Sequence, residues 1–340
     1  MSSVESNAFL EKLFIANMTE TSSARPAISV IMPTYNTEVS FLQASVDSIL
    51  SQTFRDFEFI IIDDCSTNET QDYLKSLSDE RVKIIRNNEN FGVSKSLNIG
   101  LEMARGKYIA RMDADDISLP SRLEKQFVYM ENHPNVVLCG TGRRLFGARN
   151  EVKFTRIRDM ETYRIKSFFY YPGPQHPTWI IRSRTLFDNN ILYDEDFDYA
   201  EDYYFLIRIS KIGYIRSLNE VLLLYRIHNK QVTNDLRDRH RVANIATQKK
   251  LLSELLGDVN DREATMHYQY SYEKQFNNLS DFFKCFFWYS RLVFINIRVN
   301  KYPRIKFMTF AAKLFSLTTA QSFFPSIARS IILSKNNRRR

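Results

Sequence analysis

The sequence predicts an α/β fold with a doubly wound, mainly parallel sheet, followed by a mainly helical C-terminal region. Two observations lead to this fold class. Short apolar runs of strand length alternate with amphipathic helical segments over residues 27–120, and the links between them are short. The runs also lack the alternating polar positions of a half-exposed strand, so both faces of these strands are expected to be buried.

Four strands are predicted in this region, and each leads into a helix. The strands are expected at residues 27–32, 57–62, 82–86 and 108–112. The helices are expected at residues 38–52, from Ser66 onward, at 93–105 and from Pro120 onward. Ser66 and Glu69 have the spacing of a capping box, which predicts the start of the second helix. Gly106 follows the third helix and suits a helix C-terminus.

The chain is expected to contain three parts. Residues 1–26 form an N-terminal extension, residues 27–235 an α/β domain, and residues 236–340 a helical, basic and aromatic C-terminal region. Within the α/β domain, the pattern continues with a helix at 159–170, a helix beginning near Ala200 and a strand at 221–227. The extension lacks the pattern of a signal peptide, and its short apolar cluster is expected to pack on the body of the protein.

Charge is distributed unevenly along the chain. The net charge is +8, yet twelve Lys and Arg residues and no Asp or Glu follow Asp281, while the first 281 residues hold 35 basic and 39 acidic residues. The protein is therefore a slightly acidic body with a basic tail. Three cysteines lie far apart in the sequence, which argues against a disulfide framework or a cysteine zinc site and favours a reducing, cytosolic compartment.

The fourth predicted strand runs directly into Asp113, Asp115 and Asp116. Carboxylates this close repel one another unless a cation lies between them, and Mg²⁺ or Mn²⁺ is the usual partner. A solvated acidic turn is the alternative. Polar residues also follow the first strand (33–36) and the second (63–66), and ligands bind at this carboxyl edge of parallel sheets. The shared edge favours a binding site.

The glycine-rich motifs of common nucleotide sites are absent. No G-x-G-x-x-G follows the first strand and the chain has no G-K-[ST] loop, which argues against a dinucleotide-binding domain and a P-loop enzyme. A bound nucleotide would therefore be held by side chains and a metal. Tyr35 offers a stacking face, Asp64 an acceptor for a base or ribose, and the acidic cluster a metal for a diphosphate.

Nine motifs in register closely resemble glycosyltransferase family 2 of the GT-A fold, the type that builds bacterial surface polysaccharides. The resemblance covers about residues 27–232. On the nucleotide side, the motifs are SVIMPTYN (29–36), SQTF (51–54), IIDD (61–64), NIG (98–100), GKYI (106–109) and MDADDI (112–117). On the acceptor side, they include HPT (176–178), AED (200–202) and YRIH (225–228). The family assignment divides the domain into a nucleotide-binding part, 27–118, and an acceptor part, 119–235.

The resemblance implies roles for the donor-side residues. Seven residues would border the uracil of a UDP-sugar, bind its ribose or contact its phosphates: Pro33, Thr34, Tyr35, Asn36, Asp64, Lys95 and Asp113. Asp115 would ligate Mn²⁺ or Mg²⁺ on the diphosphate, with Asp116 as a substitute. His228 resembles the histidine that completes the metal site in some relatives; a capped strand end beside the site is the alternative. For Lys95 the alternative is a solvated helix face.

The resemblance also implies an inverting transfer to a hydroxyl of a saccharide acceptor, which would be linked to a lipid diphosphate. Asp202 would be the general base and Glu201 would bind the acceptor, although acidic residues also favour the first turn of helices. His176 and Trp179 would line the acceptor or donor-sugar pocket, unless Trp179 belongs to the core. Two other functions remain open: a sugar nucleotidyltransferase, and a protein that binds a nucleotide-sugar without catalysis. A receiver domain is disfavoured because no acidic pair follows the first strand.

The C-terminal region interleaves aromatic residues with cations from Phe282 onward. Such a pattern occurs in nucleic-acid-binding segments and in helices that lie on anionic membranes. We expect peripheral attachment to the inner face of a membrane, without nucleic acid. A membrane-spanning helix at 307–327 is disfavoured because Lys313, Gln321 and Pro325 interrupt it. The alternative is a helical subdomain or an oligomer interface, and the oligomeric state is left open.

Overall fold

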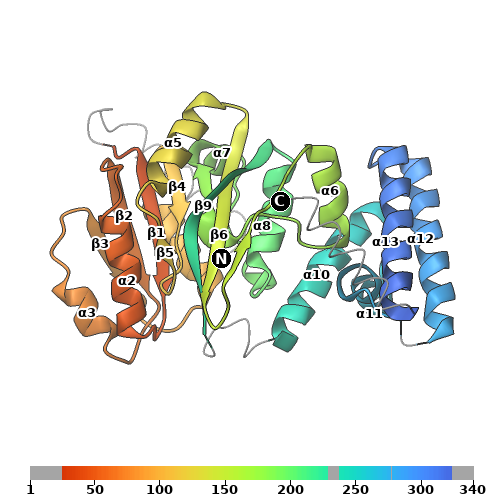
Figure 1. The fold of residues 1–340 in the computed structure, drawn as a ribbon, viewed down its shortest axis with the longest axis horizontal. Coiled ribbons are helices and arrows are strands. Elements are labelled where there is room, and N and C mark those ends of the chain that lie inside the picture. The colour runs from red at the N-terminus through yellow and green to blue at the C-terminus, as the bar shows by residue number, and fades with distance from the viewer. Residues whose placement is uncertain (1–24, 229–236, 277, 324–340) are drawn as a thin grey trace. The chain divides into compact units, whose positions relative to one another are not determined.

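The computed structural model of the protein describes residues 25–228, 237–276 and 278–323 (Figure 1). The predicted N-terminal extension up to residue 24 and the last part of the basic tail lie outside this range. The chain divides into two compact units. The first contains residues up to 157 together with 173–236, and the second contains 158–172 together with residues from 237 onward.

The first unit is built on one mixed, mainly parallel sheet of nine strands, which confirms the predicted fold class. Strand order is β3-β2-β1-β4-β8-β6-β9-β5, with β7 paired to β6. The bounds are β1 Ile28–Thr34, β2 Phe57–Asp63, β3 Val82–Arg86, β4 Tyr108–Arg111, β5 Ile117–Ser118, β6 Val136–Gly147, β7 Glu151–Lys153, β8 Ile180–Arg182 and β9 Tyr214–Ile227. Strands β1 to β4 pair in parallel, whereas β8 pairs antiparallel to both β4 and β6.

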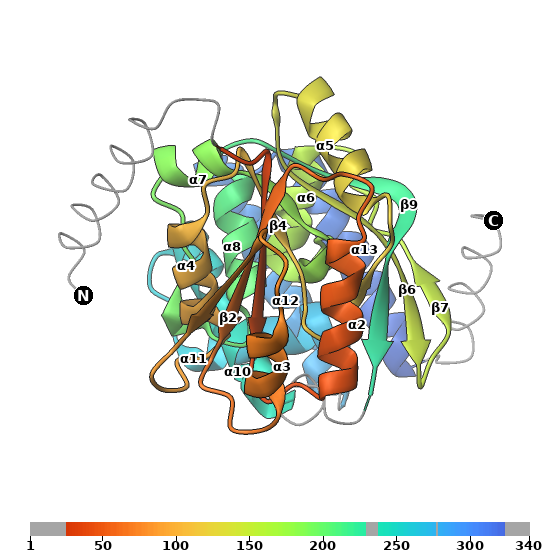
Figure 2. The same ribbon diagram turned by 90° about the vertical axis from the view of Figure 1, so that its left-hand side faces the viewer.

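Helices cover both faces of the sheet, as a doubly wound fold requires. Figure 2 shows α2 and α4 on opposite sides of β1 and β2. The bounds in this unit are α2 Val39–Leu50, α3 Thr70–Ser76, α4 Val93–Met103, α5 Arg122–Asn132, the short 3₁₀ helix η1 His176–Thr178, α7 Ser183–Asp188, the 3₁₀ helix η2 Glu195–Phe197 and α8 Glu201–Ser210.

Strands β1, β2 and β4 are buried because they consist almost entirely of apolar residues, many of them β-branched. Strand β3 forms the edge of the sheet and its Ile84 is exposed, so the expectation that both faces are buried is wrong for this strand. Val30, Phe59, Ile61 and Ala110 are fully buried in one core cluster. Each large apolar side chain in such a core contributes about 1.5–3 kcal/mol to folding. The strands also approach their connections closely: a Cβ on Gly106 would lie 2.4 Å from the backbone nitrogen of Ser29. The sheet is therefore a rigid support for the loops at its carboxyl edge.

The capping box predicted at Ser66 is wrong. Helix α3 begins at Thr70, and no side chain caps it from Glu69. The hydroxyl of Ser66 instead accepts a hydrogen bond from the backbone nitrogen of Asn36, at 2.9 Å. Ser66 therefore joins the loops after β1 and β2 and does not begin a helix.

The second unit is helical. It contains α6 Met160–Phe169, α10 Arg237–Leu256, α11 Asp261–Tyr268, the π-helical turn η3 Gln269–Glu273, α12 Leu279–Val299 and α13 Arg304–Phe323. Helix α6, which we expected to belong to the acceptor part, packs with these C-terminal helices. Throughout the described ranges, no helix has both the length and the apolarity needed to cross a membrane.

A buried histidine connects three helices of this unit. His267 of α11 is fully buried; its Nε2 lies 3.0 Å from the backbone oxygen of Phe168, and its Nδ1 accepts a hydrogen bond from the indole of Trp288 at 3.0 Å. The ring is therefore neutral, with its proton on Nε2. Burial lowers the pKa of His267 to about 4 from an ordinary value near 6.5.

We predict that the second unit loses stability between pH 6.5 and pH 4. In this window the unfolded chain protonates His267 and the folded chain does not, so falling pH favours unfolding by up to about 3 kcal/mol. Urea unfolding followed by Trp288 fluorescence at pH 7 and pH 5 measures the effect. A His267→Gln variant keeps a donor and an acceptor and should show a flatter pH dependence; the same slope as wild type would contradict the prediction.

Candidate active site

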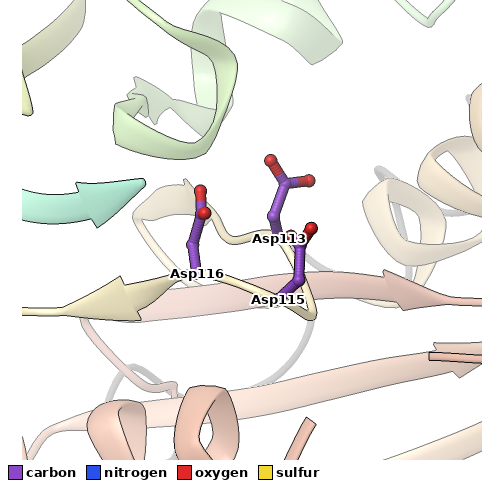
Figure 3. A group of neighbouring side chains, drawn as sticks. All are labelled: Asp113, Asp115 and Asp116. Carbon is purple, nitrogen blue, oxygen red and sulfur yellow. The ribbon is translucent and has the colours of Figure 1, made fainter. Parts of the chain in front are cut away.

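The acidic loop between β4 and β5 brings three carboxylates together. One oxygen from each of Asp113, Asp115 and Asp116 lies within 4.8 Å of the others. Figure 3 shows all three side chains extending from the loop toward the same side. The loop follows the end of β4, at the carboxyl edge where the sequence predicted a binding site. Geometry of this kind suits a hard divalent cation with oxygen ligands.

Helix α2 and the segment just after it hold the backbone of the acidic loop and of β5 through three buried polar side chains. Ser45 Oγ donates to the backbone oxygen of Asp113 at 2.7 Å, and Ser48 Oγ accepts from the backbone nitrogen of Ser118 at 3.0 Å. Gln52 Nε2 donates to the backbone oxygen of Leu119 at 2.9 Å. The three residues recur at helical spacing. Sequence reasoning missed their role, although polar residues on an otherwise apolar helix face are a readable signal.

A fully buried arginine supports the same loop from α5. Arg122 Nη2 donates to the backbone oxygen of Arg111 at 2.6 Å, and its Nη1 lies 3.3 Å from the sulfur of Met112. Burial lowers the pKa of Arg122 to about 9, and the charge of Asp116 opposes this shift. A buried cation next to a crowded acidic loop reduces the repulsion within it. Sequence reasoning did not identify this residue either.

Asp116 is the most deeply buried member of the cluster, with no exposed surface. Its Oδ1 accepts from the backbone nitrogen of Arg226 at 2.8 Å. Its Oδ2 has no hydrogen-bond partner among the residues that the structure describes. Burial and the charges of Asp113 and Asp115 raise the pKa of Asp116 well above its ordinary value. A bound cation would satisfy the orphaned oxygen and remove the repulsion, so these residues fit a divalent metal ion.

The residue after β9 brings an imidazole nitrogen to the cluster. His228 Nε2 lies 2.9 Å from Asp115 Oδ2. Arg226, two residues earlier, donates from Nε to the backbone oxygen of Asp115 at 2.8 Å. The guanidinium carbon of Arg226 lies 4.1 Å from the ring centre of Phe41 and 4.5 Å from that of Phe146. This packing fixes the end of β9, so His228 is held beside the carboxylates.

On the donor side, Tyr35 is half exposed at the end of β1, where its ring is accessible for stacking. Pro33 is partly buried and Thr34 fully buried in the same strand. Asn36 adopts a left-handed backbone (φ 49°), and its side-chain oxygen accepts from the backbone nitrogen of Thr67 at 2.7 Å. Asn36 is also exposed, but its side chain connects the loops after β1 and β2, whereas the ring of Tyr35 is open to solvent.

The carboxylate of Asp64 organises the loop before α4. It accepts hydrogen bonds from the backbone nitrogens of Phe91 and Gly92, both at 2.9 Å, and from the side chain of Asn87 at 2.7 Å. Gly92 has φ 85°, a conformation that favours glycine. Lys95 lies over the ring of Phe91, with its nitrogen 3.5 Å from the ring centre. Asp64 is therefore already engaged by this loop before any ligand binds.

On the acceptor side, His176 and Trp179 are buried. His176 Nε2 lies 2.7 Å from the hydroxyl of Tyr193, and burial together with Arg111 lowers the pKa of His176 well below its usual range. Trp179 has no exposed surface, and its indole nitrogen donates to the backbone oxygen of Pro174 at 2.9 Å. The structure thus places Trp179 in the core beneath the site, the alternative that its sequence context left open.

Glu201 and Asp202 occupy the first turn of α8. Glu201 is largely buried, and its Oε1 lies 3.7 Å from His176 Nδ1. Burial, and next the charge of Asp202, raise the pKa of Glu201 to about 8. Asp202 is half-buried. Two adjacent carboxyl groups can take different tasks: a protonated Glu201 can donate a hydrogen bond, and a carboxylate at 202 can accept a proton.

Arg111 lies between the donor and acceptor groups. Its buried guanidinium forms an ion pair with Asp113, and its charge also interacts with Tyr193 and Glu201. The charge of Asp202 in turn acts on Asp113. The acidic loop and the start of α8 therefore form one electrostatic unit, as a site that joins two substrates requires.

The fold and this site indicate a glycosyltransferase, and comparisons with known proteins lead to the same class. The fold is shared with Staphylococcus aureus TarS, residues 1–349, solved in complex with UDP-GlcNAc: the TM-score is 0.56, sequence identity 17%, and the match covers 87% of this chain and 93% of that one. The family described as "Glycosyl transferase family 2" matches residues 29–190.

Curated relatives extend the match. An uncharacterized glycosyltransferase of Haemophilus influenzae is 33% identical over 220 residues, which is 62% of this chain and 68% of that protein. An uncharacterized glycosyltransferase of Methanocaldococcus jannaschii is 37% identical over 61% of this chain and 72% of its own length. The O-antigen biosynthesis glycosyltransferase WbnJ of Escherichia coli is 36% identical over 60% and 80%, respectively. This chain belongs to glycosyltransferase family 2 and has a GT-A-like fold, as its motifs predicted.

Proposed function

We propose that this glycosyltransferase moves a sugar from a UDP-sugar to a hydroxyl of a saccharide acceptor, with inversion at the anomeric carbon, in surface-polysaccharide synthesis. The observation that carries the proposal is the cluster of three carboxylates with His228, which lies at the same carboxyl edge of the sheet as the exposed Tyr35. TarS, with the same fold, has been solved with UDP-GlcNAc, and WbnJ is named for O-antigen biosynthesis. The TarS complex supports a UDP-sugar donor, and the name of WbnJ supports a saccharide acceptor.

Asp115, Asp116 and His228 are the residues that would hold Mn²⁺ or Mg²⁺. When bound, the ion acts as a Lewis acid that neutralises charge developing on the leaving diphosphate. Asp113 would bind the ribose, and its ion pair with Arg111 limits how far its carboxylate can turn. Tyr35 would stack on the uracil. Asp64, held by the backbone of Phe91 and Gly92, would contact the base only through its remaining acceptor capacity.

On the acceptor side, we assign the general base to Asp202. It would take the proton of the attacking hydroxyl while the oxygen of that hydroxyl displaces UDP from the anomeric carbon. Glu201, whose pKa is raised by burial, would donate a hydrogen bond to the acceptor. His176 would keep Glu201 in place, since its own second nitrogen is engaged by Tyr193. One direct displacement inverts the anomeric centre.

An acceptor linked to a lipid diphosphate is supported by the charge of the β6–β7 hairpin. Arg143 lies against the ring of Tyr225, whose pKa is raised by burial and by the acidic loop. Arg144 and Arg149 are exposed on the same hairpin, which holds a single acidic residue, Glu151. A basic surface beside the acidic loop would attract a diphosphate without competing for the metal. Such an acceptor implies work at the inner face of the cell membrane.

The test is a screen of UDP-sugars for UDP release in the presence of Mn²⁺ or Mg²⁺, with saccharide acceptors that carry or lack a lipid diphosphate. We expect one donor to release UDP with metal, and faster with the diphosphate acceptor. Release of pyrophosphate from a sugar phosphate and UTP would instead indicate a nucleotidyltransferase. Binding of UDP-sugars without release of either product, across the acceptors tried, would favour a protein that only binds them.

A further inference from the structure

Helix α12 has two apolar faces, and only one of them packs against the other helices of the second unit. The first face holds Cys285, Trp288, Leu292 and Asn296, at helical spacing and buried against the neighbouring helices. Two polar groups on this face have partners: the indole of Trp288 donates to His267, and the amide of Asn296 donates to the backbone oxygen of Tyr302 at 3.0 Å. This face makes the core of the second unit.

The opposite face of α12 is a stripe of large apolar side chains open to solvent. The exposed fraction reaches 51% for Phe283, 66% for Phe287 and 52% for Phe294. Most members lie three, four or seven residues from another member, so they form one continuous strip along the helix. The strip consists of Leu279, Phe283, Phe286, Phe287, Phe294 and Ile297. Monomeric soluble proteins rarely expose so much contiguous apolar surface, and such patches mark interaction sites.

A row of basic residues runs along one side of this strip. Lys284, Arg291 and Arg298 are all exposed and lie seven residues apart, so they share one line on the helix surface. The guanidinium carbon of Arg298 lies 4.4 Å from the ring centre of Phe294, beside the strip. Lys284 and Arg291 each also pair with a carboxylate of their own unit, Asp281 at 3.4 Å and Glu263 at 2.5 Å.

Helix α13 continues the same composition. Figure 1 shows α12 and α13 side by side, and they run antiparallel because the link at 300–303 is short. Ile305 and Met308 of α13 are exposed by 75% and 48%. Together the two helices carry six basic residues and one acidic residue, the buried Asp281. Their exposed surface is therefore apolar and cationic.

We propose that the exposed strip of α12 is a docking surface for a bilayer rich in anionic lipid. The helix would lie in the plane of the interface, with the phenylalanine rings among the acyl chains and the basic row against lipid phosphates. Charge complementarity selects this partner over a second copy of the chain. Two copies packed antiparallel through the strip would bring their basic rows side by side, where like charges repel. The proposal does not depend on the identity of the donor or acceptor.

The experiment measures binding of the full chain to vesicles of phosphatidylcholine with or without phosphatidylglycerol. We expect binding to the anionic vesicles that weakens as salt rises. Phe283→Ser combined with Phe287→Ser should weaken vesicle binding at least about tenfold, because two rings that would be buried among the acyl chains are removed. Arg298→Glu should weaken binding to the anionic vesicles and leave any binding to neutral ones unchanged. Met103→Ser and Val128→Ser, at similarly exposed positions of the first unit, are the matched controls.

Circular dichroism and transfer to a soluble saccharide acceptor establish that the serine variant is folded, and both should match wild type. Equal vesicle binding by wild type and the serine variant would overturn the proposal. So would a wild-type chain that ignores vesicles but self-associates, with the serine variant monomeric, because the strip would then be a contact between copies. If transfer fails for every UDP-sugar while vesicle binding responds to these substitutions, the result contradicts the proposed function and leaves the docking surface supported.

Discussion

Replacing Asp115 by alanine is expected to reduce sugar transfer at least about a thousandfold while leaving the protein folded. Stabilising charge on a leaving diphosphate is worth several kcal/mol, and Asp115 is our main metal ligand. Its side chain is only partly buried, and its contact at Oδ2 is with His228, so removing it leaves no buried group of the core unpaired. The measured quantities are kcat for transfer and the release of UDP.

Metal binding can be followed separately from activity. A ligand that binds the folded state raises its melting temperature, so Mn²⁺ should stabilise the wild-type chain and should stabilise Asp115→Ala much less. Asp72→Ala is the control, since Asp72 is an exposed acidic residue of α3 far along the chain from the acidic loop. EDTA should abolish transfer, and added Mn²⁺ or Mg²⁺ should restore it. Full activity in EDTA would remove the metal from the mechanism.

The same measurements show which of Asp115 and Asp116 is the main metal ligand. If Asp116 is the main ligand, Asp115→Ala should keep most of the stabilisation by Mn²⁺, and Asp116→Ala should lose it. The structure gives a reason to test both: Asp116 has an orphaned buried oxygen, whereas Asp115 contacts the histidine. A buried carboxylate that is already crowded in the absence of a cation gains the most from one.

The location of this site could be predicted from the sequence because it depends on local patterns. Buried strands that end in Tyr35, Asp64 and Asp113 define one sheet edge once the strands are parallel. The residues that support the site could not be predicted in this way. Ser45 lies on the largely apolar face of α2 and Gln52 lies just after this helix, and their partners Asp113 and Leu119 are more than 65 residues away. Such contacts depend on tertiary packing, which a local pattern does not encode.

The strands in the half of the sheet that contains β6 and β9 were also difficult to predict from local patterns. Strand β6 was not predicted, and β9 is twice as long as the strand expected at 221–227. Strand β6 contains glycine and polar residues and β9 contains polar residues, which weaken a strand pattern. The two strands are stabilised by pairing with each other over most of their length. The burial of Trp179 is also a product of packing. Its sequence context, next to the buried strand β8, allowed either a core position or a pocket wall.

An Asp202→Asn variant is expected to bind UDP-sugar normally and to lose turnover by about 10²–10⁴-fold, the usual contribution of a general base. The amide is nearly the same size as the carboxylate, so the first turn of α8 should keep its structure. It cannot take a proton from the acceptor hydroxyl. Donor affinity by calorimetry and kcat for transfer separate the two effects. Asp196→Asn, in the exposed turn η2 shortly before α8, is the matched control with the same change of charge.

Glu201→Gln gives the contrast that identifies the roles of the pair. Because burial raises the pKa of Glu201, its protonated form donates a hydrogen bond, and a glutamine amide can replace that donor. We therefore expect Glu201→Gln to keep most of kcat and to change KM for the acceptor only modestly, the opposite of Asp202→Asn. Retained turnover in Asp202→Asn together with a large loss of kcat in Glu201→Gln would exchange the two assignments. Since the raised pKa of Glu201 depends partly on the charge of Asp202, neutralising Asp202 should also lower it. The carboxylate at 201 would then form at a lower pH than in wild type, and any residual activity of Asp202→Asn should rise with pH as it forms.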